Sequence, residues 1–170
     1  GPPLLEQFEE YAGIDEETAR KAVEIYRERY APIGIFENEL YPGIEEMLSG
    51  LKNRGYKLAI ASSKPEVFVK IVAEHFHIDS YFDEMVGSEP EGGRTNKTEV
   101  IEEALKRLGL SEHRDQVMMV GDKEHDVFGA RRAGLECIAV SYGYGTEEEL
   151  ENAHPYKIVN SAEEILDFFA

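Results

Sequence analysis

The sequence predicts an α/β fold, in which a parallel sheet is covered by helices on both faces and preceded by a small helical segment. Three patterns predict it. Beyond Gly55, short apolar runs alternate with stretches of helical periodicity, which is typical of strand–helix–strand units. Each apolar run is hydrophobic on both faces, as expected of strands buried between two helical layers. Residues 4–54 show only helical periodicity.

The N-terminal segment is expected to be helical because its apolar residues recur at spacings of three and four over residues 4–30. Asp15 supplies an N-cap, and Ala31-Pro32 ends the helix that follows it. The turn sequence Tyr41-Pro42-Gly43 then precedes a further helix over residues 44–52.

Strands and helices alternate in the rest of the chain. The expected elements are strand 56–61, helix 65–75, strand 82–87, helix 97–108, strand 116–120, helix 127–133, strand 136–141, strand 156–159 and helix 162–169. A polar loop with glycines, residues 89–96, precedes the helix at 97. Because functional groups of such sheets gather at the carboxyl ends of the strands, the residues after each strand are candidates for a site.

Composition limits the partners. The 170 residues include 18 Lys plus Arg against 35 Asp plus Glu, a net charge of −17. Nucleic acid and anionic membrane are not expected partners, because phosphate affinity depends on clustered Lys and Arg. The single cysteine, Cys137, excludes a disulfide framework and is expected to be a small buried hydrophobe. No apolar run predicts a membrane helix and the start resembles no secretory leader, so we expect a cytoplasmic protein, monomeric or homodimeric.

Two aspartates follow the strand expected at 116–120. Gly121 allows close backbone approach to a ligand, and Asp122 and Asp126 are expected on one side of the turn into the next helix. Two carboxylates, with waters and a substrate phosphate, are the usual ligands of Mg²⁺. An alternative stays open, in which Asp126 caps a helix starting near Val127 and Asp122 is a turn residue.

Hydroxyl groups and cations are expected at the same edge of the sheet. Ser62 and Ser63 follow a strand, so the Ser62 hydroxyl and nearby backbone N–H groups can receive an anionic oxygen. Lys97, at a helix start, can neutralise a phosphate, and Lys64 faces either the substrate or the helical segment. Helix capping by the serines and surface exposure of the lysines are the alternatives. The conjunction of hydroxyl, cation and carboxylates is what favours phosphoryl transfer.

Three strings resemble motifs two, three and four of the haloacid dehalogenase superfamily of phosphatases: LAIASSKPEVF, KTEVIEEAL and VMMVGDKEHDVFGARRAG. GPPL at the start, YRERYAPIGIFENELYPGIEEML and SYGYGTEEEL are similar to phosphoglycolate-phosphatase-like members with a helical cap. The resemblance implies a Rossmann-like core over residues 42–170 and part of a helical cap over residues 1–41.

The resemblance also implies roles for the candidate residues. Ser62 would hydrogen-bond the transferring phosphoryl group and Lys97 would steady it, with Ser63 and Lys64 beside them on the substrate. Motif two commonly has Thr where this chain has Ser62, a change that keeps the hydroxyl.

For the metal, the resemblance implies Mg²⁺ as cofactor and Asp122 as its ligand. Asp126 would be a second acidic partner, either directly or through water.

One motif of the family does not occur in this chain. It is an apolar strand ending in Asp-x-Asp-Gly-Thr, whose first Asp is the nucleophile and whose second is the acid/base. In the family this strand is central, so without it two inner strands would each present an unpaired edge. We therefore expect a longer protein, in which about 20 upstream residues supply the strand, either continuous with this chain or as a separate, cleaved piece.

The expected function is hydrolysis of a small phosphorylated metabolite, with phosphoglycolate favoured, through an aspartyl-phosphate intermediate. The chain without the first motif is expected to be inactive. Two alternatives stay open: a sugar-phosphate mutase-type phosphotransferase, and a non-catalytic acidic domain that binds phosphate.

Overall fold

The centre of the molecule consists of two parallel sheets. The computed structural model describes residues 4–89 and 93–170, so parts of the GPPL string and of the 89–96 loop lie outside the described residues. The strands are β1 (Ala59–Pro65) and β2 (Glu84–Ser88) in one sheet, and β3 (Met118–Gly121), β4 (Glu136–Val140) and β5 (Lys157–Val159) in the other. Within the described ranges every pair of these strands is parallel, which confirms the predicted fold class.

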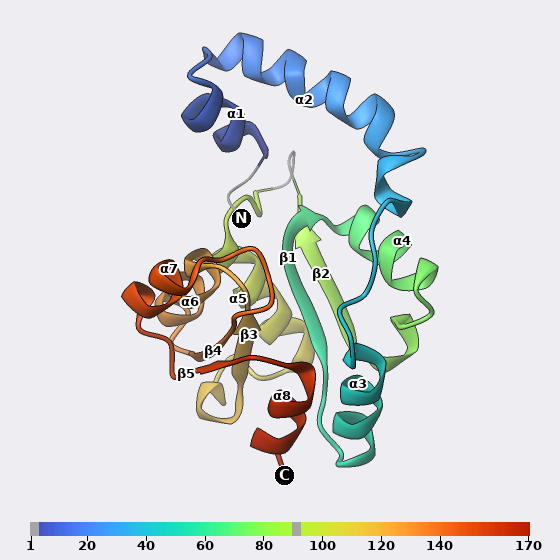
Figure 1. Cartoon of the computed structure of the whole chain (residues 1–170), viewed down its shortest axis with the longest axis vertical. Coiled ribbons are helices and arrows are strands. Elements are labelled where there is room, and N and C mark those ends of the chain that lie inside the picture. The colour runs from blue at the N-terminus through green and yellow to red at the C-terminus, as the bar shows by residue number, and fades with distance from the viewer. Residues whose placement is uncertain (1–3, 90–92) are drawn as a thin grey trace.

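Helices cover both faces of the sheets (Figure 1). On one face α5 (Lys97–Leu108), α6 (Glu124–Arg132) and α7 (Glu147–Ala153) contact one another in that order, and on the other lie α3 (Ile44–Asn53), α4 (Glu66–His75) and α8 (Ala162–Phe168). The crossovers from β1 to β2 and from β2 to β3 run in opposite directions across the fold. Because such crossovers are right-handed, they place α4 and α5 on opposite faces.

Helix α5 shows how the sequence specifies one of these elements. Asn96 and Glu99 form a reciprocal capping box at its start, and Gly109 ends it in a left-handed conformation with φ of 71°. Four residues at helical spacing form its buried face: Val100, Ile101, Ala104 and Leu105. Local capping and hydrophobic periodicity agree, and α5 has the predicted bounds.

The first strand differs from its prediction. Residues 56–58 have no regular secondary structure: the Tyr56 N–H donates to the Leu51 carbonyl, and the Leu58 N–H donates to the Asp83 carboxylate at 2.8 Å. Strand β1 therefore begins at Ala59 and continues to Pro65, so Ser62 lies inside the strand instead of after it. Its pairing with β2 is regular only for residues 59–61 and then shifts in register.

Helix α6 begins at Glu124, so the prediction of a start near Val127 is wrong. Asp126 occupies the third helical position and accepts a hydrogen bond from the Lys123 N–H. Helix α7 was not predicted, because only Leu150 and Ala153 of its seven residues are buried and give it little periodicity. The other strands, β2 to β5, and the helices α3, α4 and α8 match their predictions with shifts of at most two residues.

The N-terminal segment is helical, as predicted. It contains α1 (Leu4–Ala12), α2 (Glu16–Tyr30) and a 3₁₀ turn at Gly34–Phe36. Asp15 caps α2 by accepting the Thr18 N–H at 3.0 Å. Figure 1 shows α1 and α2 standing away from the sheets, and the division into cap and core near residue 41 stays a prediction. Among the described helices, none combines the length and apolar character that a membrane span requires.

A cluster of charges fixes α4 to α5. The Glu66 carboxylate accepts hydrogen bonds from Arg107 at 3.1 Å, Arg94 at 3.2 Å and Lys70 at 2.9 Å, and its side chain is only 17% exposed. Burial acts to raise the pKa of this carboxyl group. Hydrogen bonds from Arg107, Lys70 and the Gly87 N–H outweigh burial and lower the pKa from 4.5 to about 2.

We predict that Glu66→Gln lowers the free energy of unfolding at pH 7 by about 1–3 kcal/mol, because it removes a shared, mostly buried carboxylate. Since the pKa is lower in the folded state, the stabilisation is complete above pH 4.5 and is lost as the pH falls toward about 2. In urea unfolding, the free energies of unfolding of the unsubstituted chain and of Glu66→Gln should therefore become equal as the pH falls.

The control is Glu16→Gln, which breaks an exposed pair with Arg20 and should cost less than about 0.5 kcal/mol. The prediction would be contradicted if Glu66→Gln lost no more free energy of unfolding than Glu16→Gln, or if its loss did not change with pH.

Candidate functional site

A cleft of about 1150 Å³ separates β1 of one sheet from β3 of the other. Residues 59–62 form one wall and residues 118–122 the other. Strand β1 pairs with β2 and β3 pairs with β4, so within the described residues the two edges along the cleft have no strand partner. Apolar side chains from three helices complete the lining, among them Met47, Leu48, Leu51, Ile101, Ala104, Leu105 and Ile165. Two facing, unpaired edges are what the sequence predicted for a chain without the family's central strand.

Four of the predicted site residues line this one cleft: Ser62, Lys97, Asp122 and Asp126. Lys97 connects its two walls. The Lys97 ammonium donates to the Ala61 carbonyl of β1 at 3.1 Å and pairs with Asp126 Oδ1 on α6 at 2.9 Å. Only 14% of the Lys97 side chain and 6% of the Asp126 side chain are exposed. The structure thus brings together the hydroxyl, the cation and the carboxylates that the sequence placed at one edge.

Asp126 organises its surroundings with both carboxylate oxygens. Oδ1 pairs with Lys97, and Oδ2 accepts the N–H groups of Asp122 and Lys123, each at 3.0 Å. Burial acts to raise the pKa of the Asp126 carboxyl, but the Lys97 charge and the hydrogen bonds from Lys97 and the Lys123 N–H lower it below its ordinary value. A Cβ at Gly121 would lie 2.2 Å from the Asp126 Cβ, so glycine is required here to admit Asp126.

Asp122 is held by the loop that follows β4. Its Oδ2 accepts the Tyr144 N–H at 2.8 Å, and its carbonyl accepts the Gly145 N–H at 3.0 Å. A Cβ at Gly143 would lie 2.2 Å from the Asp122 Cβ. The glycines of the SYGYG string therefore let this loop close against Asp122, a contact that sequence reasoning did not predict.

These groups fit a divalent cation only in part. One oxygen of the Asp122 carboxylate accepts Tyr144, and both oxygens of Asp126 already bind donors of the chain. In residues 4–89 and 93–170, no three His, Cys, Asp or Glu side chains form a group that could hold a metal. The described part of the chain therefore offers Asp122 as one ligand, and a complete site would need others. Metal ligation by Asp122 and Asp126 stays a prediction.

The motif-two residues divide between the faces of β1. Ser62 and Lys64 lie on one face, and the Ser62 Oγ accepts the Lys64 N–H at 3.2 Å. Ser63 alternates to the other face and lines neither the cleft nor the pocket described next. Pro65, without a side-chain hydrogen bond, occupies the cap position of α4, so neither serine caps that helix.

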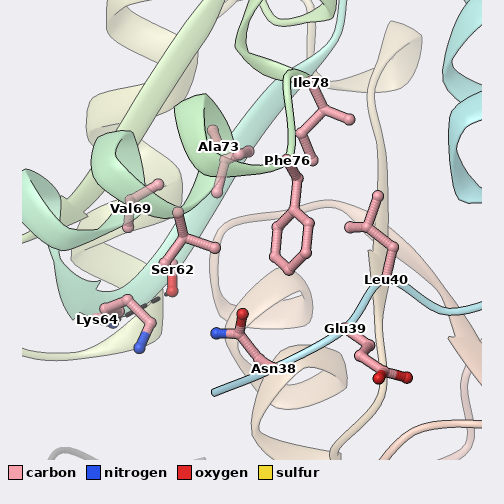
Figure 2. Close-up of a pocket in the computed structure, with 11 residues that line it drawn as sticks. Asn38, Glu39, Leu40, Ser62, Lys64, Val69, Ala73, Phe76 and Ile78 are labelled. Carbon is pink, nitrogen blue, oxygen red and sulfur yellow. Dashed lines mark hydrogen bonds between the residues drawn. The ribbon is translucent and has the colours of Figure 1, made fainter. Parts of the chain in front are cut away.

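A second hollow, a pocket of about 270 Å³, opens beside Ser62 (Figure 2). It lies between residues 38–40, strand β1 and helix α4. Asn38, Ser62 and Lys64 lie at one end, and Leu40 and Phe76 at the other.

Lys64 also contacts the N-terminal segment. Its ammonium donates to the Tyr30 hydroxyl and lies 4.5 Å from the centroid of the Tyr30 ring. Tyr30 packs edge-on against Phe68 of α4, with ring centroids 5.6 Å apart. The contact agrees with one of the two alternatives left open by the sequence, that Lys64 faces the helical segment, although periodicity marked Tyr30 only as an apolar helix residue.

Cys137 lies in β4 and is buried. Burial raises the pKa of its thiol to about 12, so the thiolate is scarce at neutral pH. The prediction of a structural cysteine is confirmed.

We predict that Lys97→Met lowers the free energy of unfolding by about 3 kcal/mol, because it leaves the Asp126 charge buried without its cation. The double variant Lys97→Met/Asp126→Asn should recover part of that loss, since the uncompensated charge is gone. Urea unfolding of the single and double variants measures the coupling. Strictly additive losses would show that the two side chains do not stabilise each other.

Comparison with known proteins agrees with the motifs. The family model described as haloacid dehalogenase-like hydrolase matches residues 1–140. A 5'-nucleotidase of Pseudomonas aeruginosa is 44% identical over 91% of this chain and 69% of its own length. The tyrosine-protein kinase PtkA of Mycobacterium tuberculosis is 33% identical over 95% of this chain and 54% of its own.

A phosphoglycolate phosphatase of Pseudomonas savastanoi is 27% identical over 92% of this chain, which spans 57% of that protein's length. Among solved structures, that of a predicted phosphatase from Clostridium acetobutylicum superposes with a TM-score of 0.94 at 45% identity, covering 99% of this chain and 77% of that one. Because the family model matches most of its length, the chain belongs to the haloacid dehalogenase-like hydrolases.

Proposed function

We propose that the chain forms most of a Mg²⁺-dependent phosphatase that hydrolyses monoesters of small phosphorylated metabolites, phosphoglycolate among them. One observation carries the proposal: Lys97 bridges the Ala61 carbonyl and Asp126 in the cleft that Ser62 and Asp122 also line. A hydroxyl, an ammonium and a carboxylate around one hollow are suited to a phosphoryl group beside a divalent ion. The phosphatase names among the relatives support the same reaction class.

Each residue of the chain has a distinct role in this proposal. The Ser62 hydroxyl donates to a phosphoryl oxygen, and the Lys97 ammonium balances the charge of the others. Asp126 orients Lys97 and the backbone of Asp122. Asp122 gives one carboxylate to Mg²⁺, which when bound would offset the charge of the phosphoryl group and its attacking carboxylate.

The nucleophile comes from a strand that enters the cleft between β1 and β3. Such a strand satisfies both open edges, and its carboxyl end arrives where Ser62, Lys97 and Asp122 line the cleft. An aspartate there attacks phosphorus, forming an aspartyl phosphate as the ester oxygen leaves and takes a proton from a second acid. Water, giving a proton back to the second acid, then attacks phosphorus, which breaks the bond to the aspartate, releases phosphate and restores the carboxylate.

Nucleoside monophosphates are a second substrate class, favoured by the 44% identity to the protein named 5'-nucleotidase. The two classes differ in the alcohol that leaves and not in the phosphoryl chemistry. Comparing kcat/KM for phosphoglycolate with kcat/KM for nucleoside monophosphates would distinguish the two substrate classes.

The test is turnover of p-nitrophenyl phosphate by this chain extended upstream with an apolar strand that ends in Asp-x-Asp. We expect hydrolysis with Mg²⁺ and none with a chelator. The same extended chain with Asn for the first aspartate is the control, and it should be inactive. If phosphate binds but no ester is hydrolysed, the chain is a phosphate-binding domain and the proposal is wrong. Phosphate transfer to a sugar acceptor in place of water would indicate a mutase.

We further predict that Asp122→Asn in the extended chain lowers Mg²⁺ affinity and turnover together by at least about tenfold, because it removes a charged ligand at nearly constant size. The Mg²⁺ dependence of the initial rate measures both effects. Asp167→Asn, at an exposed position of α8, is the matched control. Unchanged turnover in Asp122→Asn would remove this residue from the metal site.

A further inference from the structure

The SYGYGTEEEL string, residues 141–150, follows β4 and lies against the turn that connects β3 to α6. Its first half holds Asp122 at two points. The Tyr144 N–H donates to the Asp122 Oδ2 at 2.8 Å, and the Gly145 N–H donates to the Asp122 carbonyl at 3.0 Å. A Cβ at Gly145 would lie 2.2 Å from that carbonyl oxygen, so this close contact requires glycine. One loop therefore holds both the side chain and the backbone of Asp122.

The second half of the same string holds the next two residues of the turn. The Glu149 carboxylate, in the first turn of α7, pairs with the Lys123 ammonium at 2.8 Å and accepts the Glu124 N–H at 3.3 Å. Thr146 caps α7 by accepting the Glu149 N–H at 3.2 Å, which fixes the start of that helix. The string thus holds residues 122–124 together, and a displacement of its first half would reach Asp122 directly.

Tyr142 connects this string to two other parts of the molecule. Its side chain packs against the buried cluster that contains Val140 and Ile165. Its ring also meets the ring of Tyr41 edge-on, with centroids 5.1 Å apart and an angle of 66° between the ring planes. Burial raises the pKa of the Tyr142 hydroxyl, with further contributions from Tyr41 and Asp122, which agrees with a position close to that aspartate.

Tyr41 belongs to the connection between the N-terminal helices and α3. The upstream end of this connection is tied to α2, because the Arg29 guanidinium donates to both oxygens of Glu37 at 2.8 Å. Pro42 follows Tyr41 and restricts the backbone of both residues. A change in the position of α2 would therefore be passed along this short connection to Tyr41, and through the ring contact to Tyr142.

We propose that Tyr142 is a positioning residue, whose contact with Tyr41 keeps the loop at residues 143–145 closed on Asp122. The affinity of Asp122 for a divalent cation then depends on where the N-terminal helical segment lies. The inference rests on the proposed role of Asp122 as a Mg²⁺ ligand. A carboxylate that is already held in place binds at lower cost, because it need not be ordered when the cation arrives. Loss of the ring contact loosens the loop, and the cost of ordering the carboxylate returns as weaker binding.

A purely structural role for Tyr142 predicts different behaviour. If its ring only stabilises the fold, Tyr142→Leu lowers the free energy of unfolding and leaves the Mg²⁺ affinity of the folded protein unchanged. If the ring positions Asp122, a substitution at Tyr41, on the other side of the contact, should weaken Mg²⁺ binding in the same way. The double variant should then lose no more affinity than either single variant, because both substitutions break the same contact.

The experiment measures Mg²⁺ binding to the extended chain by titration calorimetry, together with the Mg²⁺ dependence of p-nitrophenyl phosphate turnover. We expect Tyr142→Leu and Tyr41→Leu each to weaken Mg²⁺ binding about fivefold, the size expected for one edge-on aromatic contact. Turnover at saturating Mg²⁺ should change by less than about twofold, because the bound cation itself holds the carboxylate. Tyr142→Phe keeps the ring and should behave as the unsubstituted chain.

Tyr156→Leu is the matched control. Tyr156 also makes an edge-on contact, with its ring centroid 5.8 Å from that of Phe168, but it precedes β5 and lies outside the 141–150 string. Because this substitution removes the same kind of contact elsewhere in the fold, Mg²⁺ binding should equal that of the unsubstituted chain.

Unchanged Mg²⁺ affinity in Tyr142→Leu, losses that add in the double variant, or an equal loss in Tyr156→Leu would overturn the inference and leave the phosphatase function standing. If Tyr142→Leu does not fold, Tyr41→Leu decides in its place, since Tyr41 is 40% exposed. If the unsubstituted extended chain binds Mg²⁺ but hydrolyses no ester, the proposed function fails and calorimetry still tests the inference. If it binds no Mg²⁺, both fail.

Discussion

The ion pair between Lys97 and Asp126 joins two sheets that otherwise meet across a cleft. Lys97 begins α5, which packs on β1 and β2, whereas Asp126 lies in the first turn of α6, which packs on β3 and β4. A mostly buried pair of this kind is retained only when each charge has further partners. Here the Ala61 carbonyl accepts a hydrogen bond from the Lys97 ammonium, and two backbone N–H groups donate to the Asp126 carboxylate. The contact that joins the two walls of the cleft is therefore also the one that fixes the Lys97 ammonium and the Asp126 carboxylate within it.

Two glycines in the loops around this ion pair let aspartate side chains pack directly against the backbone. There is no room for a Cβ at Gly121, where Asp126 packs, or at Gly143, where Asp122 packs. The hydrogen bond from the Tyr144 N–H then fixes the Asp122 carboxylate in place. Pre-organisation of this kind lowers the cost of binding, since the side chains need not be ordered when a ligand arrives. The two aspartates thus differ, because both oxygens of Asp126 bind donors, whereas Asp122 lines the cleft and, within residues 4–89 and 93–170, only its Oδ2 accepts a hydrogen bond.

The sequence predicted what depends on local signals. The bounds of α5 follow from the Asn96 cap, the buried stripe and Gly109, all within 14 residues of one another along the chain. The start of β1 could not be predicted in this way, because the Asp83 carboxylate that holds the Leu58 N–H lies 25 residues further on. For the site, the positions of Ser62 and Asp122 near strand ends and of Lys97 at a helix start were enough to predict that they gather at one edge of the sheet. The contact of Tyr30 with Lys64 depends on how α2 lies against β1, and no pattern within either segment records it.

In the proposed enzyme, the two open strand edges connect stability with catalysis. Backbone N–H and C=O groups along β1 and β3 need hydrogen-bond partners, and the apolar side chains around them need cover. A strand that enters the cleft meets both needs and carries its last residues to Ser62, Lys97 and Asp122. In that arrangement, the segment that completes the sheet is the one that brings the nucleophile. Substitutions that weaken its pairing would then lower stability and turnover together.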